Sequence, residues 1–188
     1  REAVLTAIKD LESMTGLPIE SVFVGITGTH VTFENRRDKF QVNDDSGVIT
    51  SDDLDRIPTW LHSEKLESGR KLIHAVKMTY SLDGNVGIRN PVGMHSKDVE
   101  VETHVVTGGS LFIRKLMEAV EEAGVKIESL VLEPLASGMA VLRNEEKERL
   151  AIVVDIGGGT TDIVGFKRGR ICYTGVIPVG GYQFTNDI

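Results

Sequence analysis

The chain has 188 residues, enough for one ordinary domain or two small ones. Its hydrophobic and charged fractions, 40% and 26%, are typical of a globular protein, and no apolar run is long enough to predict a membrane span. The net charge of -7, without a basic stripe, argues against nucleic-acid binding, which depends on cationic contacts with phosphates. A single cysteine, Cys172, excludes an internal disulfide framework, and without a secretory signal the sequence predicts a cytoplasmic protein.

The first part of the chain predicts one helix followed by strands. Apolar residues at helical spacing predict a helix over residues 1–15, ended by Gly16. Residues rich in β-branched side chains predict a strand over 21–27 and a second, short strand over 30–33. The polar stretch 34–45 is expected to be a loop.

A second helix and two long strands follow. Thr50 or Ser51 is a candidate N-cap of a helix, which Pro58 is expected to kink. The apolar face of this helix would consist of Leu54, Ile57, Trp60 and Leu61. Clear alternation of apolar and polar residues predicts long strands over 71–82 and 97–107.

After residue 107 the pattern changes to alternating strands and helices. Ser110 is expected to cap a helix, a short strand is predicted at 127–132, and Pro134 begins another helix that ends near Leu142. A charged turn then leads to the apolar run 151–156, which is expected to be a strand buried on both faces. Two more strands are predicted at residues 162–166 and 170–177.

These patterns divide the chain into two regions. Residues 19–106 predict a small sheet with one helix, whereas residues 107–188, with the first helix, predict an α/β unit into which that small sheet is inserted. The chain begins at Arg1 inside a predicted helix and stops at Ile188 where another helix begins. We therefore expect it to be a piece of a longer protein.

The segment 155–162, which reads Asp-Ile-Gly-Gly-Gly-Thr-Thr-Asp, has the composition of a phosphate-binding turn. Its three glycines can adopt positive φ and aim successive backbone N–H groups at an anion, while Thr160 and Thr161 add hydroxyl donors. Asp155, at the end of the predicted strand, can hold Mg²⁺ directly or through water. The structural alternative is a tight hairpin turn. Neither a P-loop nor a dinucleotide-binding turn has this spacing.

Two segments resemble motifs of the actin-like ATPases. Residues 155–162 resemble the second phosphate-binding hairpin of that superfamily, which implies that Asp155, Gly157, Gly158, Gly159, Thr160 and Thr161 hold ATP, with Asp155 attending Mg²⁺. Residues 133–137 resemble the segment that carries a carboxylate or amide near the attacking water, which implies that Glu133 orients this nucleophile. The alternative for Glu133 is a helix-start acid that favours the helix dipole.

The chain as a whole resembles the FtsA family of bacterial cell-division proteins. The segments that carry this resemblance, besides the glycine turn, are residues 21–28, 87–94 and 175–181. It implies an α/β fold: an actin-like (ribonuclease H-like) ATPase subdomain with an inserted small α+β module of the strand-helix-strand (SHS2) type. The expected parts are the end of the first subdomain (1–18), the inserted module (19–106), the rest of that subdomain (107–180) and the start of the next (181–188).

The resemblance also implies a function and partners. Family members polymerise with ATP, link the FtsZ ring to the inner face of the cell membrane at the division site, and recruit division proteins. We expect the inserted module to mediate self-association and contacts with division proteins, and expect the FtsZ-binding region and the membrane anchor to lie outside this chain. ATP hydrolysis should be weak at most, and this piece alone is expected to be inactive, because the first phosphate hairpin is missing.

Two alternatives stay open within the same superfamily. One is an assembly protein of the pilus or secretion type, and the other is an actin-fold kinase or vigorous ATPase, although no acceptor-substrate motif is visible. A zinc site is not expected, because the histidines are scattered and only Cys172 is available beside them. His74, on the apolar side of a predicted strand, is expected to be a core histidine.

Overall fold

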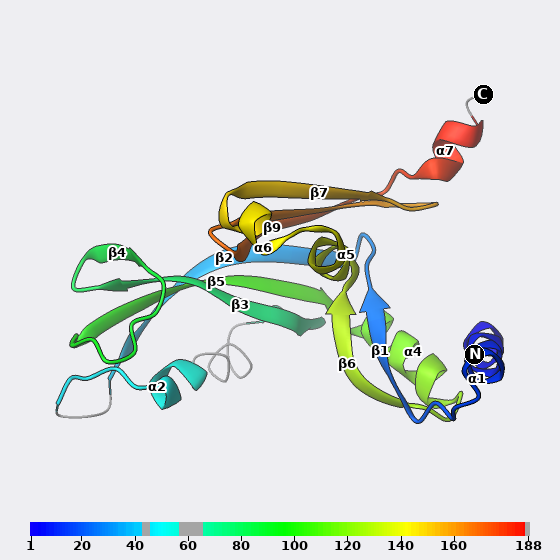
Figure 1. Cartoon of the computed structure of the whole chain (residues 1–188), viewed down its shortest axis with the longest axis horizontal. Helices are drawn as coiled ribbons and strands as arrows, with labels where there is room; N and C mark the ends of the chain where they lie inside the picture. The colour runs from blue at the N-terminus through cyan, green and yellow to red at the C-terminus, as the bar shows by residue number, and fades with distance from the viewer. Residues whose placement is uncertain (43–45, 57–65, 187–188) are drawn as a thin grey trace.

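The computed structural model describes residues 1–42, 46–56 and 66–186, with the side chain of Phe184 left undescribed. The described strands form three sheets (Figure 1). β1 (Ser21–Ile26) and β6 (Lys126–Leu132) form a parallel pair, which requires a crossover connection between them. The inserted sheet lies within that connection, so the predicted insertion into an α/β unit is the arrangement observed. No helix in the described part of the chain is long and apolar enough to cross a membrane.

The inserted sheet has four antiparallel strands in the order β2-β5-β3-β4. Its strands are β2 (Val31–Gln41), β5 (Asp98–Gly109), β3 (Arg70–Leu82) and β4 (Asn85–Ile88). β1, which the sequence analysis assigned to the inserted module, pairs with β6 and stays outside this sheet. The observed sheet therefore begins after β1.

The predicted loop over residues 34–45 is wrong as far as Gln41, because β2 continues through it. Its residues pair in unbroken register with β5, from Val31 opposite Gly108 to Gln41 opposite Asp98. One face of the strand is solvent-exposed and carries charges, such as Arg37, whose guanidinium lies 3.7 Å from a Glu102 carboxylate oxygen. A sequence segment with many charged residues is typical of a loop. Here the same segment forms a strand, because pairing with β5 stabilises it.

The helix predicted after Thr50 is present as α2 (Ser51–Asp55), with the expected N-cap. The Thr50 hydroxyl accepts a hydrogen bond from the Asp53 N–H, and the Asp53 carboxylate accepts one from the Thr50 N–H, which completes a capping box. Leu54 joins the core of the inserted sheet with Phe40, Ile49, Tyr80, Leu82, Val99 and Val101. The predicted Ile57, Pro58, Trp60 and Leu61 lie outside the described residues.

Helix α4 (Ser110–Glu121) begins directly after β5 and packs against β6. Ser110 is not its cap as predicted. The N-cap is Gly109, and the Ser110 N–H donates to the Gly69 carbonyl at 2.8 Å. Ile113 of α4 is fully buried among Ile26, Val31, Val106 and Leu132. Helix α1 (Glu2–Thr15) ends at Gly16 in the left-handed conformation, as predicted, and has no buried residue.

The third sheet is the antiparallel meander of β7 (Leu150–Ile156), β8 (Thr161–Lys167) and β9 (Arg170–Ile177). The helices α5 (Glu133–Val141) and α6 (Asn144–Glu148) precede it, and α6 occupies the predicted charged turn. α5 approaches β8 so closely that a Cβ on Gly138 would lie 2.5 Å from the Phe166 ring. A short helix, α7 (Gly181–Asn186), follows β9.

The prediction that residues 151–156 are buried on both faces is wrong. β7 is an edge strand, and its apolar side chains Leu150, Ile152, Val154 and Ile156 are 54–68% exposed. The intervening side chains Ala151, Val153 and Asp155 are half-buried, because α5 packs against that face of the strand, where Val153 joins the cluster of Val164, Phe166 and Ile171. A continuous apolar run therefore does not distinguish a two-sided from a one-sided contact.

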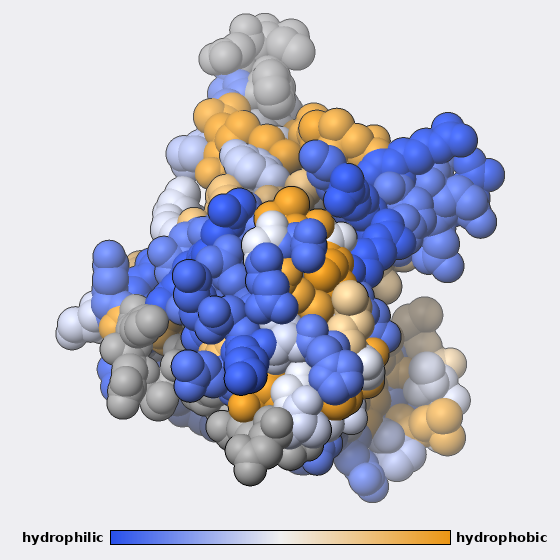
Figure 2. All heavy atoms as spheres, turned by 90° about the vertical axis from the view of Figure 1, so that its left-hand side faces the viewer, coloured by the Kyte–Doolittle hydropathy of each residue, from blue (hydrophilic) through white to orange (hydrophobic). Residues whose placement is uncertain are grey.

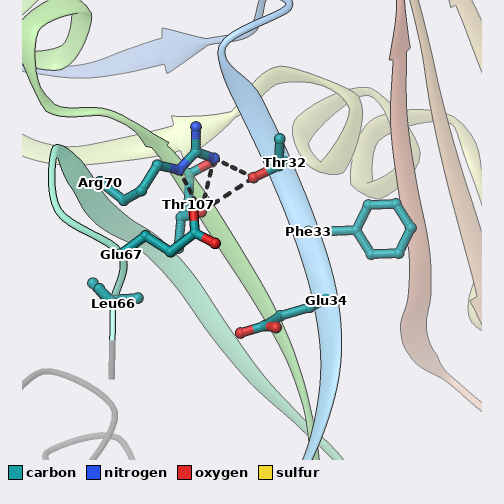
Figure 3. Close-up of a pocket in the computed structure, with 7 residues that line it drawn as sticks. All are labelled: Thr32, Phe33, Glu34, Leu66, Glu67, Arg70 and Thr107. Carbon is teal, nitrogen blue, oxygen red and sulfur yellow. Dashed lines mark hydrogen bonds between the residues drawn. The ribbon is translucent and has the colours of Figure 1, made fainter. Parts of the chain in front are cut away.

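Arg70 joins three strands of the inserted sheet at the edge of a cavity of about 220 Å³ (Figure 3). Its guanidinium donates to the carbonyl of His30 at 2.8 Å, to the carbonyl of Thr107 at 2.9 Å, and to the hydroxyls of Thr32 and Thr107. These bonds engage the N–H donors of the guanidinium within the sheet, so Arg70 does not present them freely to the cavity. Its role is structural.

Replacing Arg70 by lysine is therefore expected to lower the free energy of unfolding by about 2 kcal/mol, because an ammonium cannot make these forked hydrogen bonds. Urea denaturation at neutral pH measures this. Arg149→Lys, at an exposed position, is the control and should change the unfolding free energy little. An equal loss in both variants would contradict the structural role.

A half-buried histidine and a fully buried one extend the sequence analysis. His74 on β3, predicted to be a core histidine, is half-buried, and its Nε2 accepts from the Leu132 N–H at 3.0 Å. His104 on β5 is fully buried, with Nδ1 2.6 Å from the Asn35 amide oxygen and Nε2 3.2 Å from the Thr174 hydroxyl. Because the Asn35 oxygen can only accept, Nδ1 carries the proton and Nε2 accepts from Thr174. His104 therefore links β2 and β5 of the inserted sheet to β9.

Candidate functional site

The glycine turn joins β7 to β8 at one end of the three-stranded meander (Figure 1). The Gly157 N–H donates to the Thr160 carbonyl at 2.9 Å and closes the turn. Among the described residues, the N–H groups of Gly158 and Gly159 have no hydrogen-bond acceptor, and both residues are exposed. Two successive exposed donors at a turn can bind an anion such as a phosphate group.

None of the three glycines has the positive φ that the sequence analysis allowed for, because all lie outside the left-handed region. Close packing explains two of these glycines, Gly157 and Gly158. A Cβ at Gly157 would lie 3.2 Å from the Thr160 carbonyl oxygen, and one at Gly158 would lie 3.1 Å from the Tyr182 ring. A Cβ at Gly159 would meet nothing within 4 Å, so packing within the described chain does not require glycine at this position.

Helix α7 is seated directly on this turn. The Gly157 carbonyl accepts from the Gly181 N–H at 2.8 Å, and the Gly158 carbonyl accepts from the Tyr182 N–H at 2.9 Å. Gly180 is required here, since its Cβ would lie 2.6 Å from both carbonyl oxygens. The segment after β9 therefore sets the orientation of the turn, which leaves its N–H groups free for a ligand.

Two aspartates face each other across β7 and β8, and neighbouring elements hold each of them. Asp155 is the cross-strand partner of Asp162. The Ser137 hydroxyl of α5 donates to Asp155 at 2.6 Å, and the hydroxyl of Thr27, which follows β1, donates to the buried Asp162. Four segments thus converge on one acidic centre beside the glycine turn.

Glu133 lies at this same centre. It is the first residue of α5, directly after β6, and a Cβ on Gly25 of the neighbouring β1 would lie 3.0 Å from its side chain. Burial raises the pKa of Glu133, and the negative charges of Asp162 and Asp155 raise it further. The structure therefore brings together Glu133 and Asp155, which the sequence analysis singled out separately.

The acidic centre suits a Mg²⁺ ion that keeps most of its water. No cluster of three or more His, Cys, Asp or Glu side chains within residues 1–42, 46–56 and 66–186 is arranged to hold a metal. Mg²⁺ in nucleotide sites commonly uses one or two carboxylates, with waters and phosphate oxygens completing its shell. Asp155, half-exposed and oriented by Ser137, fits that use.

The two threonines of the turn differ in their freedom to bind. The Thr160 hydroxyl lies 3.4 Å from an Asp162 carboxylate oxygen, a long hydrogen bond. The Thr161 hydroxyl donates to the Val179 carbonyl at 2.8 Å, so its proton is already engaged. Thr160 is therefore the better placed of the two to donate to a ligand.

Sequence reasoning did not assign Thr27, Ser137 or Asp162 to the site. Asp162 lies within the quoted glycine segment, and its place opposite Asp155 would have followed from treating that segment as a hairpin. Thr27 contacts Asp162 across 135 positions of sequence, and Ser137 contacts Asp155 across 18. No local pattern signals such contacts.

Comparison with protein families and curated proteins gives a consistent result. The model described as "SHS2 domain inserted in FTSA" matches residues 28–107, and the model "Cell division protein FtsA" matches residues 152–188. Over 187 residues, and all of this chain, the sequence is 35% identical to cell division protein FtsA of Neisseria meningitidis, 34% to that of Pseudomonas aeruginosa and 30% to that of Escherichia coli K12. The chain spans 44–45% of the length of these relatives.

Solved structures support the same architecture. A chain of the "PilM-PilN type IV pilus biogenesis complex" aligns with 98% of this chain and 50% of its own length, with a TM-score of 0.66 and 17% sequence identity. At this identity the likeness concerns the fold alone. The observed fold is an actin-like ATPase fold with an SHS2 insertion.

Proposed function

This chain belongs to the FtsA family of cell-division proteins, and we propose that its glycine turn binds the terminal phosphates of ATP. The observation that carries the proposal is the pair of unpartnered, exposed N–H groups of Gly158 and Gly159, beside an acidic centre. Thr160, and Thr161 if its bond to Val179 opens, add hydroxyl donors. Gly157 closes the turn.

Asp155 would hold Mg²⁺, and Glu133 would orient a water molecule near the terminal phosphate. Bound Mg²⁺ would neutralise phosphate charge, which is its usual contribution to phosphoryl transfer. The raised pKa of Glu133 is consistent with a carboxylate held close to two others, and such a group can accept a hydrogen bond from water. Hydrolysis is proposed to be weak at most, with ATP acting mainly as a cofactor of polymerisation.

At the level of the cell, we propose that the protein polymerises, links the FtsZ ring to the membrane and recruits other division proteins. Its place would be the inner face of the cell membrane at the division site. The inserted sheet is proposed to mediate self-association and contacts with division proteins. Contacts with FtsZ and the membrane are proposed to use family regions beyond the part matched here, in keeping with the 44–45% of the relatives' length that this chain spans.

Co-sedimentation tests this role. A full-length family protein carrying this chain should pellet with FtsZ filaments in the presence of ATP. Binding to a pilus membrane protein without FtsZ binding would favour the pilus-type alternative, and rapid phosphate release or transfer to a small acceptor would favour the kinase or ATPase alternative. Either result would overturn the proposal.

Asp155→Asn tests the metal. In the same full-length protein, the change should weaken ATP binding about tenfold with Mg²⁺ present and much less with EDTA, since the amide keeps the shape but loses the charge that Mg²⁺ prefers. Fluorescence titration with a labelled ATP analogue measures both affinities. Ser137→Ala is the companion variant, because it removes only the hydroxyl that orients Asp155 and should cause a smaller, Mg²⁺-dependent loss. Equal losses with and without Mg²⁺ would show that Asp155 is structural.

A further inference from the structure

A second cavity, of about 420 Å³, lies between the inserted sheet and the turn that joins β8 to β9. Its cationic lining consists of Arg89, Lys167, Arg168 and Arg170. β8 separates this turn from the glycine turn, and seven extended residues span roughly 20 Å. The two turns lie at opposite ends of the meander (Figure 1), so this cavity is distinct from the proposed ATP site.

The cavity concentrates positive charge in a chain whose net charge is -7. Four cations line it, and Glu102 is the acidic residue among the lining side chains. Glu102 is already engaged, since it accepts from the Thr79 hydroxyl at 3.3 Å and lies 3.7 Å from the Arg37 guanidinium. Figure 2 looks onto this end of the molecule, where hydrophilic side chains cover much of the surface around an apolar strip.

Two of the cations are held in place by the fold. The Arg170 guanidinium donates to the backbone carbonyls of Lys77 and Arg89, which joins β9 to β3 and to the end of β4. Arg89 forms a forked pair with the Glu148 carboxylate, at 2.5 and 3.4 Å. The two backbone carbonyls hold the Arg170 guanidinium in the cavity wall, whereas the pair of Arg89 with Glu148 is half-exposed.

The other two cations have no partner of their own. Neither Lys167 nor Arg168 makes a side-chain hydrogen bond or ion pair with any residue that the structure describes. Arg168 also adopts a φ of 54°, a left-handed conformation that is uncommon for a residue with a Cβ, and its N–H is held by the Glu148 carbonyl at 3.1 Å. Arg168 and Gly169 form the two-residue turn between the paired Lys167 and Arg170, and this turn places both free cations at the cavity that Arg89 and Arg170 also line.

We propose that this cavity binds a small phosphate-bearing ligand, with Lys167 and Arg168 as its direct cationic contacts and Arg170 as the preformed wall. Guanidinium and ammonium groups are the usual donors to phosphate, and the volume lies within the range of about 300–1,000 Å³ typical of small-ligand sites. An anion would also offset the positive charge of Lys167, Arg168 and Arg170, none of which has a carboxylate partner among the described residues. The phosphate belongs either to a free compound or to a lipid headgroup.

Calorimetric titration of the chain with inorganic tripolyphosphate tests the proposal. The double variant Lys167→Gln and Arg168→Gln should bind at least about tenfold more weakly, as expected for the loss of two charge-assisted contacts. The control is Arg114→Gln with Lys115→Gln, an exposed pair on α4 that lines no part of the cavity and removes the same charge. The control should bind tripolyphosphate within about twofold of the unchanged chain, because it changes only the long-range electrostatic attraction between the chain and the anion.

A second experiment identifies whether the phosphate belongs to a lipid headgroup, and a third distinguishes this cavity from the glycine turn. Co-sedimentation with vesicles of phosphatidylcholine and phosphatidylglycerol, if lost in the Lys167 and Arg168 variant alone, would support the proposal with a lipid headgroup as ligand. The chain with Gly158→Val should still bind tripolyphosphate, because the glycine turn is not part of this cavity. Absence of binding to both probes, equal losses in the two double variants, or loss only with Gly158→Val would overturn the proposal.

Discussion

Replacing Gly158 by valine is expected to abolish ATP binding in a full-length family protein carrying this chain, with an affinity loss of at least about 100-fold. The added branches would stand beside the free N–H groups of the turn, where a phosphate must approach. The fold should survive, because the nearest obstacle to the new Cβ is the ring of Tyr182 at 3.1 Å, and that side chain is 71% exposed and free to move aside. Titration with a fluorescent ATP analogue measures the loss.

The control for this prediction is Ala140→Val, which adds β-branched bulk to an exposed position of α5 and should leave ATP affinity unchanged. Circular dichroism and a thermal melt of each variant check the fold. Gly159→Ala adds a second test, since its Cβ meets no protein atom within 4 Å and any effect on affinity must come from the ligand side. Unchanged affinity in a folded Gly158→Val protein would show that the turn is structural.

Acid is expected to destabilise the protein through His104. Burial lowers the pKa of His104 from 6.5 to about 4, so the folded state disfavours the protonated ring. The unfolded chain binds this proton near pH 6.5 and the folded chain only near pH 4. The stability that the neutral ring contributes is therefore complete above pH 6.5 and is lost as the pH falls from 6.5 to 4, by up to about 3 kcal/mol.

Urea denaturation between pH 7.5 and pH 4 measures how steeply the free energy of unfolding falls with pH, which is the slope that the variants below test. Burial also lowers the pKa of His74, whose Nε2 accepts from the Leu132 N–H, so this residue contributes in the same direction. His104→Gln should flatten the slope, because it removes the titrating ring, whereas His95→Gln, at an exposed position, is the control and should leave the slope steep. A slope unaffected by His104→Gln would mean that other groups cause the acid sensitivity.

The elements that sequence predicted best are those whose signals are local. The end of α1 at Gly16, the Thr50 capping box and the long strand β3 each follow from a few neighbouring residues, and the structure has all three. β2 was missed beyond Phe33, because its charged residues signal solvent and not the partner strand that stabilises them. The exposure of β7 was missed because an apolar run does not say which of its faces another element covers.

The glycine turn shows the same division between local and tertiary information. Sequence alone proposed Asp155 and the three glycines as a phosphate and metal site, because motif spacing along the chain reflects which residue types such a site requires, and the resemblance to the actin-like ATPases added Glu133. Only the tertiary structure places Glu133 beside Asp155, hydrogen-bonds Ser137 and Thr27 to the two aspartates, and seats Gly180 against the turn. These contacts join segments from 18 to 135 positions apart, and such pairings are decided by how sheets and helices pack, which no local pattern of residues specifies.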